Sequence, residues 1–343
     1  MLHSVIPRAS AVAAALFFCL MALCGAALKP SAADDSVQRV FATPQTAVEA
    51  LVSAAQAANP KAAIVPVLGP DADRILSSGD PVADANARKR FVSAYRQMHR
   101  LAYDNDGRVV LYVGADNWPL PIPLVRKGHG WAFDTAAGEK ELIYRRIGTN
   151  ELYTIDVLHN LVQAQNEYAE QARAASGMAQ YAQKILSDQG RRNGLYWPAQ
   201  AGGPESPIGP LIAKAVAEGY KRKQGGRPVP FHGYIYRVLK QQGKDAPGGA
   251  RSYVRDGRMT EGFAFLAYPA AYRSSGVMTF LVNQDGDVLQ KDLGPDTAKL
   301  VQAIVAYNPD SSWQEAAPGG VQPQEIPPEE AQPAAAQTQA GAQ

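Results

Sequence analysis

The histidines are the residues of this chain best suited to acid–base or metal chemistry. Downstream of residue 33 they are His99, His129, His159 and His232, and each falls in a different predicted element. A site with two histidine ligands would require the fold to gather them, because no pair has the spacing of a zinc-binding helix. We therefore predict no metal site and assign no catalytic residue.

One cluster combines an acid, a base and two large aromatic side chains. Asp116, Trp118, His129 and Trp131 flank a turn of the first predicted sheet. An aromatic wall beside a carboxylate and an imidazole is typical of a small-ligand pocket, and it would also suit a cofactor-free hydrolase. The alternative interpretation is a sheet rim packed with aromatic side chains.

A second cluster lies on one predicted strand. His232, Tyr234 and Tyr236 alternate along this strand and therefore share one face. Such a face suits a polar binding groove, or equally a half-exposed sheet surface. We expect Tyr234 and Tyr236 to line this exposed face.

A third candidate is an anion site on a long predicted helix. Arg145 and Arg146 lie close to Glu151, and the two guanidinium groups would attract an anion. Pairing on the helix surface explains the same residues, because Glu141 stands four positions before Arg145. Both interpretations stay open at the level of sequence.

Motifs for familiar chemistries are missing from the sequence. It has no glycine-flanked serine elbow, no phosphate-binding loop and no dinucleotide fingerprint. We therefore predict no cofactor and favour a binding or assembly role over catalysis. The expected partner is an envelope protein or a small ligand.

The first 33 residues have the pattern of a secretory signal peptide. Arg8 precedes an apolar run from Ala11 to Leu23, and Ser31 and Ala33 are the small residues of a cleavage site. This pattern predicts a periplasmic or secreted protein with no membrane span after cleavage. An uncleaved anchor is the alternative, because the apolar stretch is just long enough to cross a bilayer.

Charge and cysteine content narrow the possible partners. Both cysteines, Cys19 and Cys24, lie in the predicted signal, so the remaining chain has no thiol for disulfides or metals. Without Arg8 and Lys29 the 34 basic residues become 32, equal to the 32 acidic ones. A neutral chain does not indicate a nucleic acid as partner.

The first part of the chain reads as helices followed by a curved antiparallel sheet. Helices are expected from Pro44 to about Ala58 and from Asn86 to Arg100. Asp80, in the polar turn before the second helix, acts as a helix cap or belongs to a site. Asp106-Gly107 predicts a hairpin. Prolines at 119, 121 and 123 predict an edge strand or covered rim, since proline lacks a backbone donor.

The second part is predicted to be a long helix, a connector and a terminal sheet. Helix begins near Gly138, and the connector holds a short helix within 179–187 and another from Ile208 to Tyr220. From Phe231 to Asp292, alternating runs joined by Asp-Gly pairs predict a four-stranded antiparallel meander with flanking helices. The fold class is therefore α+β.

These patterns divide the chain into five parts. We expect a signal peptide at 1–33, an N-terminal α+β domain at 38–175, a helical connector at 176–225, and a sheet domain at 226–315. The tail at 316–343 is rich in Pro, Ala and Gln and lacks aromatic residues, a composition typical of disorder.

Several long blocks resemble one known family. SSGDPVAD, DNWPLPIPLV, WAFDTAAGEKELIYRRIGTNEL, FHGYIYRVLKQQG and GFAFLAYPAAYRSSGVMTFLVNQDG are similar to the bacterial secreted proteins grouped as domain of unknown function 2950 (DUF2950). The resemblance runs from about Val40 to Trp313. It implies no activity, cofactor or site residue.

Two looser likenesses concern the fold alone. Helices followed by a curved sheet are similar to the nuclear-transport-factor-like (NTF2-like) fold, which often encloses a pocket. The terminal helix and meander are similar to the globular head of pseudopilins. Both are analogies of architecture and carry no function.

Overall fold

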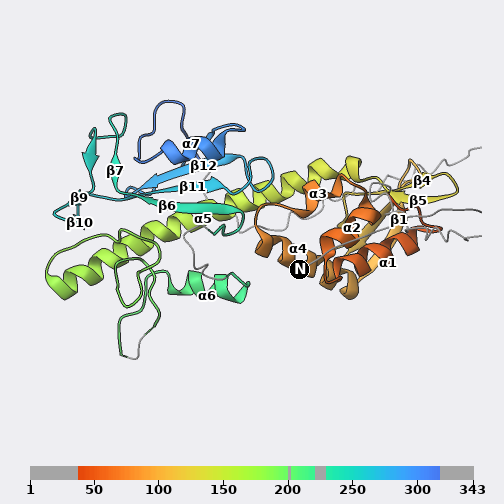
Figure 1. Ribbon diagram of the computed structural model, residues 1–343, viewed down its shortest axis with the longest axis horizontal. Helices are drawn as coiled ribbons and strands as arrows, with labels where there is room; N and C mark the ends of the chain where they lie inside the picture. The colour runs from red at the N-terminus through yellow and green to blue at the C-terminus, as the bar shows by residue number, and fades with distance from the viewer. Residues whose placement is uncertain (1–37, 200–201, 221–228, 317–343) are drawn as a thin grey trace, which may run out of the picture. The chain divides into compact units, whose positions relative to one another are not determined.

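The computed structural model describes residues 38–199, 202–220 and 229–316. These residues all belong to one compact unit of the chain, Ser36–Gln343. The predicted signal at 1–33 lies outside the described residues, as does the predicted tail beyond Ala316. The fold is mixed α+β, with N-terminal helices, antiparallel sheets, one long helix and a C-terminal five-stranded sheet (Figure 1).

Four helices come first, and local capping explains where three of them begin. A proline at the first turn follows a side-chain N-cap at Thr43, Asn59 and Asp80. The second and third helices were not predicted from the sequence, and Pro66 inside the second interrupts the usual helical signal. The helices are α1 (Pro44–Ala55), α2 (Pro60–Leu68), α3 (Ala72–Leu76) and α4 (Pro81–Gln97).

The first sheet follows these helices and is antiparallel. Its strands are β1 (His99–Tyr103), β2 (Val109–Val113), β3 (Trp118–Pro119), β4 (Leu124–Lys127) and β5 (Gly130–Phe133). They are ordered β1-β2-β4-β5, and β3 pairs only with β2. The predicted hairpin at Asp106-Gly107 is confirmed, with Gly107 at φ 76°.

The proline-rich segment after β3 is a covered rim, as predicted. Leu120 and Ile122 are buried. Gly138, near the start of the long helix, packs so closely on the backbone of Pro121 that a Cβ at this glycine would collide with the Pro121 carbonyl. The long helix therefore covers the backbone that the prolines leave without donors.

The long helix α5 (Thr135–Ser176) contributes to both hydrophobic cores. Leu142 packs on the first core, formed by the N-terminal helices and the first sheet. Leu158 and Leu161, further along, are fully buried in the second core with the C-terminal sheet. The helix starts at the Asp134 cap and ends where Gly177 is left-handed.

The connector differs from its prediction in one element. The short helix expected within 179–187 is wrong, because Tyr181 and Leu186 form isolated β-bridges there. Gln165 of α5 holds this segment extended by bonding both the amide and the carbonyl of Ala182. The second expected helix is confirmed as α6 (Gly209–Ala217).

The C-terminal sheet contains the predicted meander and one further strand. Its order is β14-β13-β12-β11-β6, and every neighbouring pair is antiparallel. The inner strand β11 is buried at all six positions, as its two-sided apolar pattern predicted. The strands are β6 (Tyr234–Leu239), β11 (Ala264–Pro269), β12 (Met278–Asn283), β13 (Leu289–Asp292) and β14 (Gln314–Glu315).

Two small hairpins interrupt this meander between β6 and β11. They are β7 (Gln241–Gln242) with β8 (Arg251–Ser252), and β9 (Val254–Arg255) with β10 (Arg258–Met259). Asp256 and Gly257 between β9 and β10 both have positive φ, which the predicted tight turn requires.

Helices pack on both faces of the C-terminal sheet (Figure 1). Tyr236 on β6 donates to Thr154 of α5. Its neighbour Arg237 donates to Val301 and Ile304, at the end of α7 (Thr297–Ala303). Because adjacent strand residues point to opposite faces, α5 covers one face and α7 the other.

Candidate functional sites

In the first cluster the acid and the base lie in two turns of the first sheet, and the tryptophans lie in the strands that follow these turns, β3 and β5. Asp116 is exposed in the β2–β3 turn, and His129 is exposed in the β4–β5 turn. Trp118 is half-buried under the guanidinium of Arg145, at 5.5 Å. Trp131 is buried and bridges to the N-terminal backbone. The hollow described below involves none of these four side chains.

The two arginines of the proposed anion site point to different partners. Arg145 Nε lies 2.6 Å from Glu141 Oε1, the ion pair that the spacing predicted. Arg146 donates to the carbonyls of Arg74 and Ile75. Burial lowers the pKa of Arg146. The guanidinium of Arg146 thus holds the end of α3 against α5.

Glu151 has a structural position as well. One of its oxygens accepts hydrogen bonds from the amides of Val277 (2.8 Å) and Met278 (3.0 Å). The carboxylate therefore attaches the start of β12 to α5.

The exposed face expected for Tyr234 and Tyr236 is a core face. Tyr234 is 0% exposed, its ring contacts Phe280, and its hydroxyl donates to the carbonyl of Met278. The hydroxyl of Tyr236 donates to Thr154. Burial raises the pKa of both tyrosines. The expectation of an exposed face is wrong because α5 covers it.

His232 is separate from these tyrosines. It precedes β6 in a turn, with a left-handed backbone at φ 48°, so its side chain does not follow the alternation of the strand. Its ring lies 3.9 Å from the ring of Tyr153 on α5. The left-handed backbone and the ring contact place His232 among side chains from three distant segments.

We call the group Asp80, Tyr153, Glu218, Tyr220 and His232 the His232 junction. Asp80 is 0% exposed, and its carboxylate accepts four hydrogen bonds. The amides of Val82 and Ala83 in its own helix bond one oxygen. The Tyr220 hydroxyl (2.8 Å) and the Gly233 amide (2.9 Å) bond the other oxygen.

An imidazole–carboxylate pair completes the junction. His232 Nε2 lies 2.7 Å from Glu218 Oε2, and neither atom has another partner among the described residues. Burial lowers the pKa of His232, and the Glu218 carboxylate opposes that shift. Burial beside Glu218 raises the pKa of Tyr153 to about 12. The junction therefore holds a neutral imidazole and a neutral phenol near pH 7.

The sequence pointed to only part of this junction. The Asp80-Pro81 pair signals a helix cap, and His232 stood out as a histidine. Nothing local marks Tyr220 and Glu218, because they reach Asp80 and His232 only in the folded chain. No group of three or more potential metal ligands occurs in the part of the chain that the structure describes.

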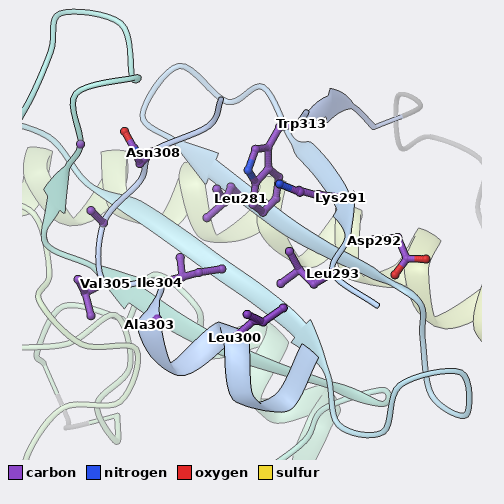
Figure 2. Close-up of a pocket in the computed structure, with 12 residues that line it drawn as sticks. Leu281, Lys291, Asp292, Leu293, Leu300, Ala303, Ile304, Val305, Asn308 and Trp313 are labelled. Atoms are coloured by element: carbon purple, nitrogen blue, oxygen red, sulfur yellow. The ribbon is translucent and has the colours of Figure 1, made fainter. Parts of the chain in front are cut away.

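A second site is an apolar hollow of about 550 Å³ on the α7 face of the C-terminal sheet, which we call the α7 groove (Figure 2). The short α7 packs on β11, and the groove lies beside it over β12 and β13. Its lining residues are Gly243, Leu281, Lys291, Asp292, Leu293, Leu300, Ala303, Ile304, Val305, Ala306, Asn308 and Trp313.

Polar groups at the rim of the α7 groove already have partners. Lys291 donates to Ser312. Asp292 accepts from Tyr272 and Gly294. Asn308 exchanges two hydrogen bonds with Asp245. What the groove offers is therefore mainly apolar surface, and no pattern in the sequence marked it in advance.

The fold and these two sites define an α+β protein with a buried polar junction and an open apolar groove. No helix in the described ranges is both long and apolar enough to cross a bilayer. The chain belongs to the DUF2950 family, described as a protein of unknown function, whose model matches residues 38–316. It has no significant match among curated proteins or solved structures.

Proposed function

We propose that this chain is a non-catalytic binding protein of the bacterial envelope and that the α7 groove is its binding surface. The observation that carries the proposal is a pair of exposed apolar side chains beside the hollow. Leu300 is 44% exposed and Val305 is 61% exposed. Both line the groove, whose polar rim is already paired.

The chemistry of the groove favours a polypeptide partner with apolar side chains. Fully burying a Leu or Val side chain contributes about 1.5–3 kcal/mol, and apolar anchors of this kind dominate interface energies. A charged ligand would gain little, because the lysine, aspartate and asparagine of the rim have internal partners. We therefore favour a partner protein over a small ligand.

The location of this binding follows from the N-terminal sequence. A cleaved signal at 1–33 would deliver the protein to the periplasm or the exterior. The envelope is then where its partner resides. The lack of cysteine downstream of residue 33 suits an oxidising compartment, since no thiol is left to react.

We also propose the finer architecture. Residues 38–175 form an NTF2-like domain, 176–225 a connector, and 226–315 a domain similar to a pseudopilin head. Two hydrophobic cores support two folded domains, and α5 is shared between them, because its residues 155–164 belong to the second core. The long α5 against an antiparallel meander supports the pseudopilin analogy.

Photo-crosslinking in cells tests the proposed binding surface. A benzophenone amino acid at Val305 should give a discrete adduct with a partner chain, to be identified by mass spectrometry. The matched control is the same substitution at Val216, which is 62% exposed on α6, away from the groove lining. Adducts of equal yield at both positions, or none at Val305, would show that the α7 groove is not the binding surface.

A further inference from the structure

We propose that one face of α4, together with the start of β1, docks on the surface of an anionic phospholipid bilayer. The face consists of Lys89, Arg90, Arg96 and Arg100, and we call it the α4 basic face. The inference goes beyond the proposed function, because the α7 groove takes no part in it. It names a second interaction surface and the chemistry of its partner.

Helical spacing brings these side chains to the solvent side of α4. The helix packs on α1, β1 and β2, and Phe91 and Tyr95 contact the first hydrophobic core. Lys89, Ser93 and Arg96 lie three or four residues apart, and at about 100° per residue they fall on the side opposite these two rings. All four cations of the α4 basic face are exposed.

The charge of this face is not neutralised within the described residues. None of its four cations forms an ion pair with a described carboxylate. Arg96 donates to the amide oxygen of Gln56. Arg100 donates to the amide oxygen of Asn117 at 2.9 Å, and its guanidinium lies 3.9 Å from the ring centre of Tyr112. These neutral partners orient two guanidinium groups and leave their charge free.

Neither the composition of the chain nor the stability of the helix accounts for this concentration of charge. Downstream of the predicted signal the acidic and basic residues are equal in number. Arg96, in the last turn, interacts favourably with the helix dipole, whereas Lys89 and Arg90 lie in the middle of α4, where the dipole gives no gain. Like charges on one face repel one another, so an anionic partner would relieve that repulsion.

The α4 basic face suits a layer of phosphate groups better than it suits a protein. The face itself has no large apolar side chain, and Met98 at its border, 41% exposed, is too little for the apolar core that a protein interface needs. Phosphate head groups are bound by charge, which contributes about fivefold in affinity for each Lys or Arg near an anionic leaflet. The proposed export would place the protein beside phospholipid bilayers.

Vesicle co-sedimentation of the full exported chain tests the proposal. The chain should bind vesicles of equimolar phosphatidylglycerol and phosphatidylcholine, and it should not bind vesicles of phosphatidylcholine alone. Lys89→Gln combined with Arg90→Gln should weaken the binding by more than about tenfold, because two cations are lost. Added salt should release the protein, since exposed charges are screened.

The matched control removes the same charge from another part of the surface. Lys244→Gln combined with Lys299→Gln changes two exposed lysines, one after β7 and one on α7. This variant should bind the vesicles as the parent does. Unaltered melting temperatures would show that both double variants are folded. Equal losses of binding would mean that overall charge holds the protein, which would overturn the inference.

A fluorescent label tests which face meets the bilayer. The chain has no cysteine downstream of residue 33, so a single introduced cysteine can be labelled selectively. An environment-sensitive dye on Ser93→Cys, within the α4 basic face, should shift to shorter wavelength when vesicles bind. The same dye on Val216→Cys, at an exposed position of α6, should not shift. Equal shifts at both positions would contradict the proposed orientation.

Two further results would overturn the inference. The first is a chain that does not bind the phosphatidylglycerol vesicles. The second is a discrete protein adduct, without lipid adducts, from a benzophenone amino acid at Ser93 in cells, which would make an acidic protein the partner. Neither result changes what is expected at Val305, so this inference and the proposed function can fail separately.

Discussion

At the residue scale, Asp80 shows how a buried charge is kept in place. An unpaired carboxylate in the interior would cost several kcal/mol, so its burial is tolerated only because donors reach both oxygens. Its role as helix cap was readable from the Asp80-Pro81 pair. Its bonds to Tyr220 and Gly233 span 140 and 153 residues, and no local pattern encodes them.

His232 makes the stability of the protein depend on pH. Its pKa is lowered in the folded chain by burial, while Glu218, Asp80 and Lys214 act on it from nearby. The unfolded chain, with an ordinary histidine pKa of about 6.5, then binds the proton more readily. The free energy of unfolding should therefore fall as the pH drops from about 6.5 toward the folded pKa of His232.

Urea unfolding at about pH 7.5 and about pH 5 measures this contribution. His232→Gln should reduce the loss of stability on acidification. His159→Gln, at an exposed position on α5, should not. Because each variant is compared with the parent, the contributions of other titrating groups cancel. One such group is Asp84, whose pKa is raised by burial. A parent and a His232→Gln variant with the same pH dependence would contradict the assignment.

At the element scale, turns and helix caps could be predicted from the sequence. Which helix packs on which face of a sheet could not. The hairpins at Asp106-Gly107 and Asp256-Gly257 are local, because positive φ angles in the turn set them: at Gly107 in the first, and at Asp256 and Gly257 in the second. The face of β6 was misjudged because α5, which covers Tyr234 and Tyr236, lies about 80 residues earlier. Alternation gives the two faces of a strand but not which one a distant helix covers.

Replacing each of two glycines of α5 with alanine should change the stability of the protein in opposite directions. Gly138→Ala places a methyl group against the carbonyl of Pro121, so we expect a loss of about 1–3 kcal/mol from overpacking. Gly148→Ala meets nothing within 4 Å, so the higher helix propensity of alanine should add about 0.5–1 kcal/mol. Chemical denaturation of both variants checks the contrast. Equal effects would mean that α5 does not cover the proline-rich rim.

The face of the C-terminal sheet that α5 covers, which carries both Tyr234 and Phe280, should be important for stability. Tyr234→Ala should cost about 3–5 kcal/mol, as should Phe280→Ala, because both rings are fully buried and touch each other. Tyr144→Ala, at a 66% exposed position of α5, should cost little. Denaturation midpoints measure these losses of stability. If Tyr234→Ala cost little, the face of β6 that carries Tyr234 would be exposed.

At the scale of the molecule, one helix and one junction join two hydrophobic cores. The residue patterns predicted an N-terminal domain and a separate sheet domain, and the apolar pattern after Gly138 predicted the long helix. That α5 contributes to both cores did not follow from its sequence, because periodicity gives a helix face without naming what packs on it. The α7 groove is likewise a product of assembly, since α7 is too short to cover the whole sheet.

The last prediction concerns the cooperativity of unfolding. Asp80 caps α4, which packs on the first core, while its partners Tyr220 and Gly233 belong to the segments around the second. With this link and the continuous α5, we expect one calorimetric transition with equal calorimetric and van't Hoff enthalpies. Asp80→Ala leaves buried donors unpaired and should separate the transition into two. Tyr220→Phe removes only one donor, so it should lower the melting temperature while unfolding remains a single transition. Two transitions in the parent chain would mean that the junction does not couple the cores.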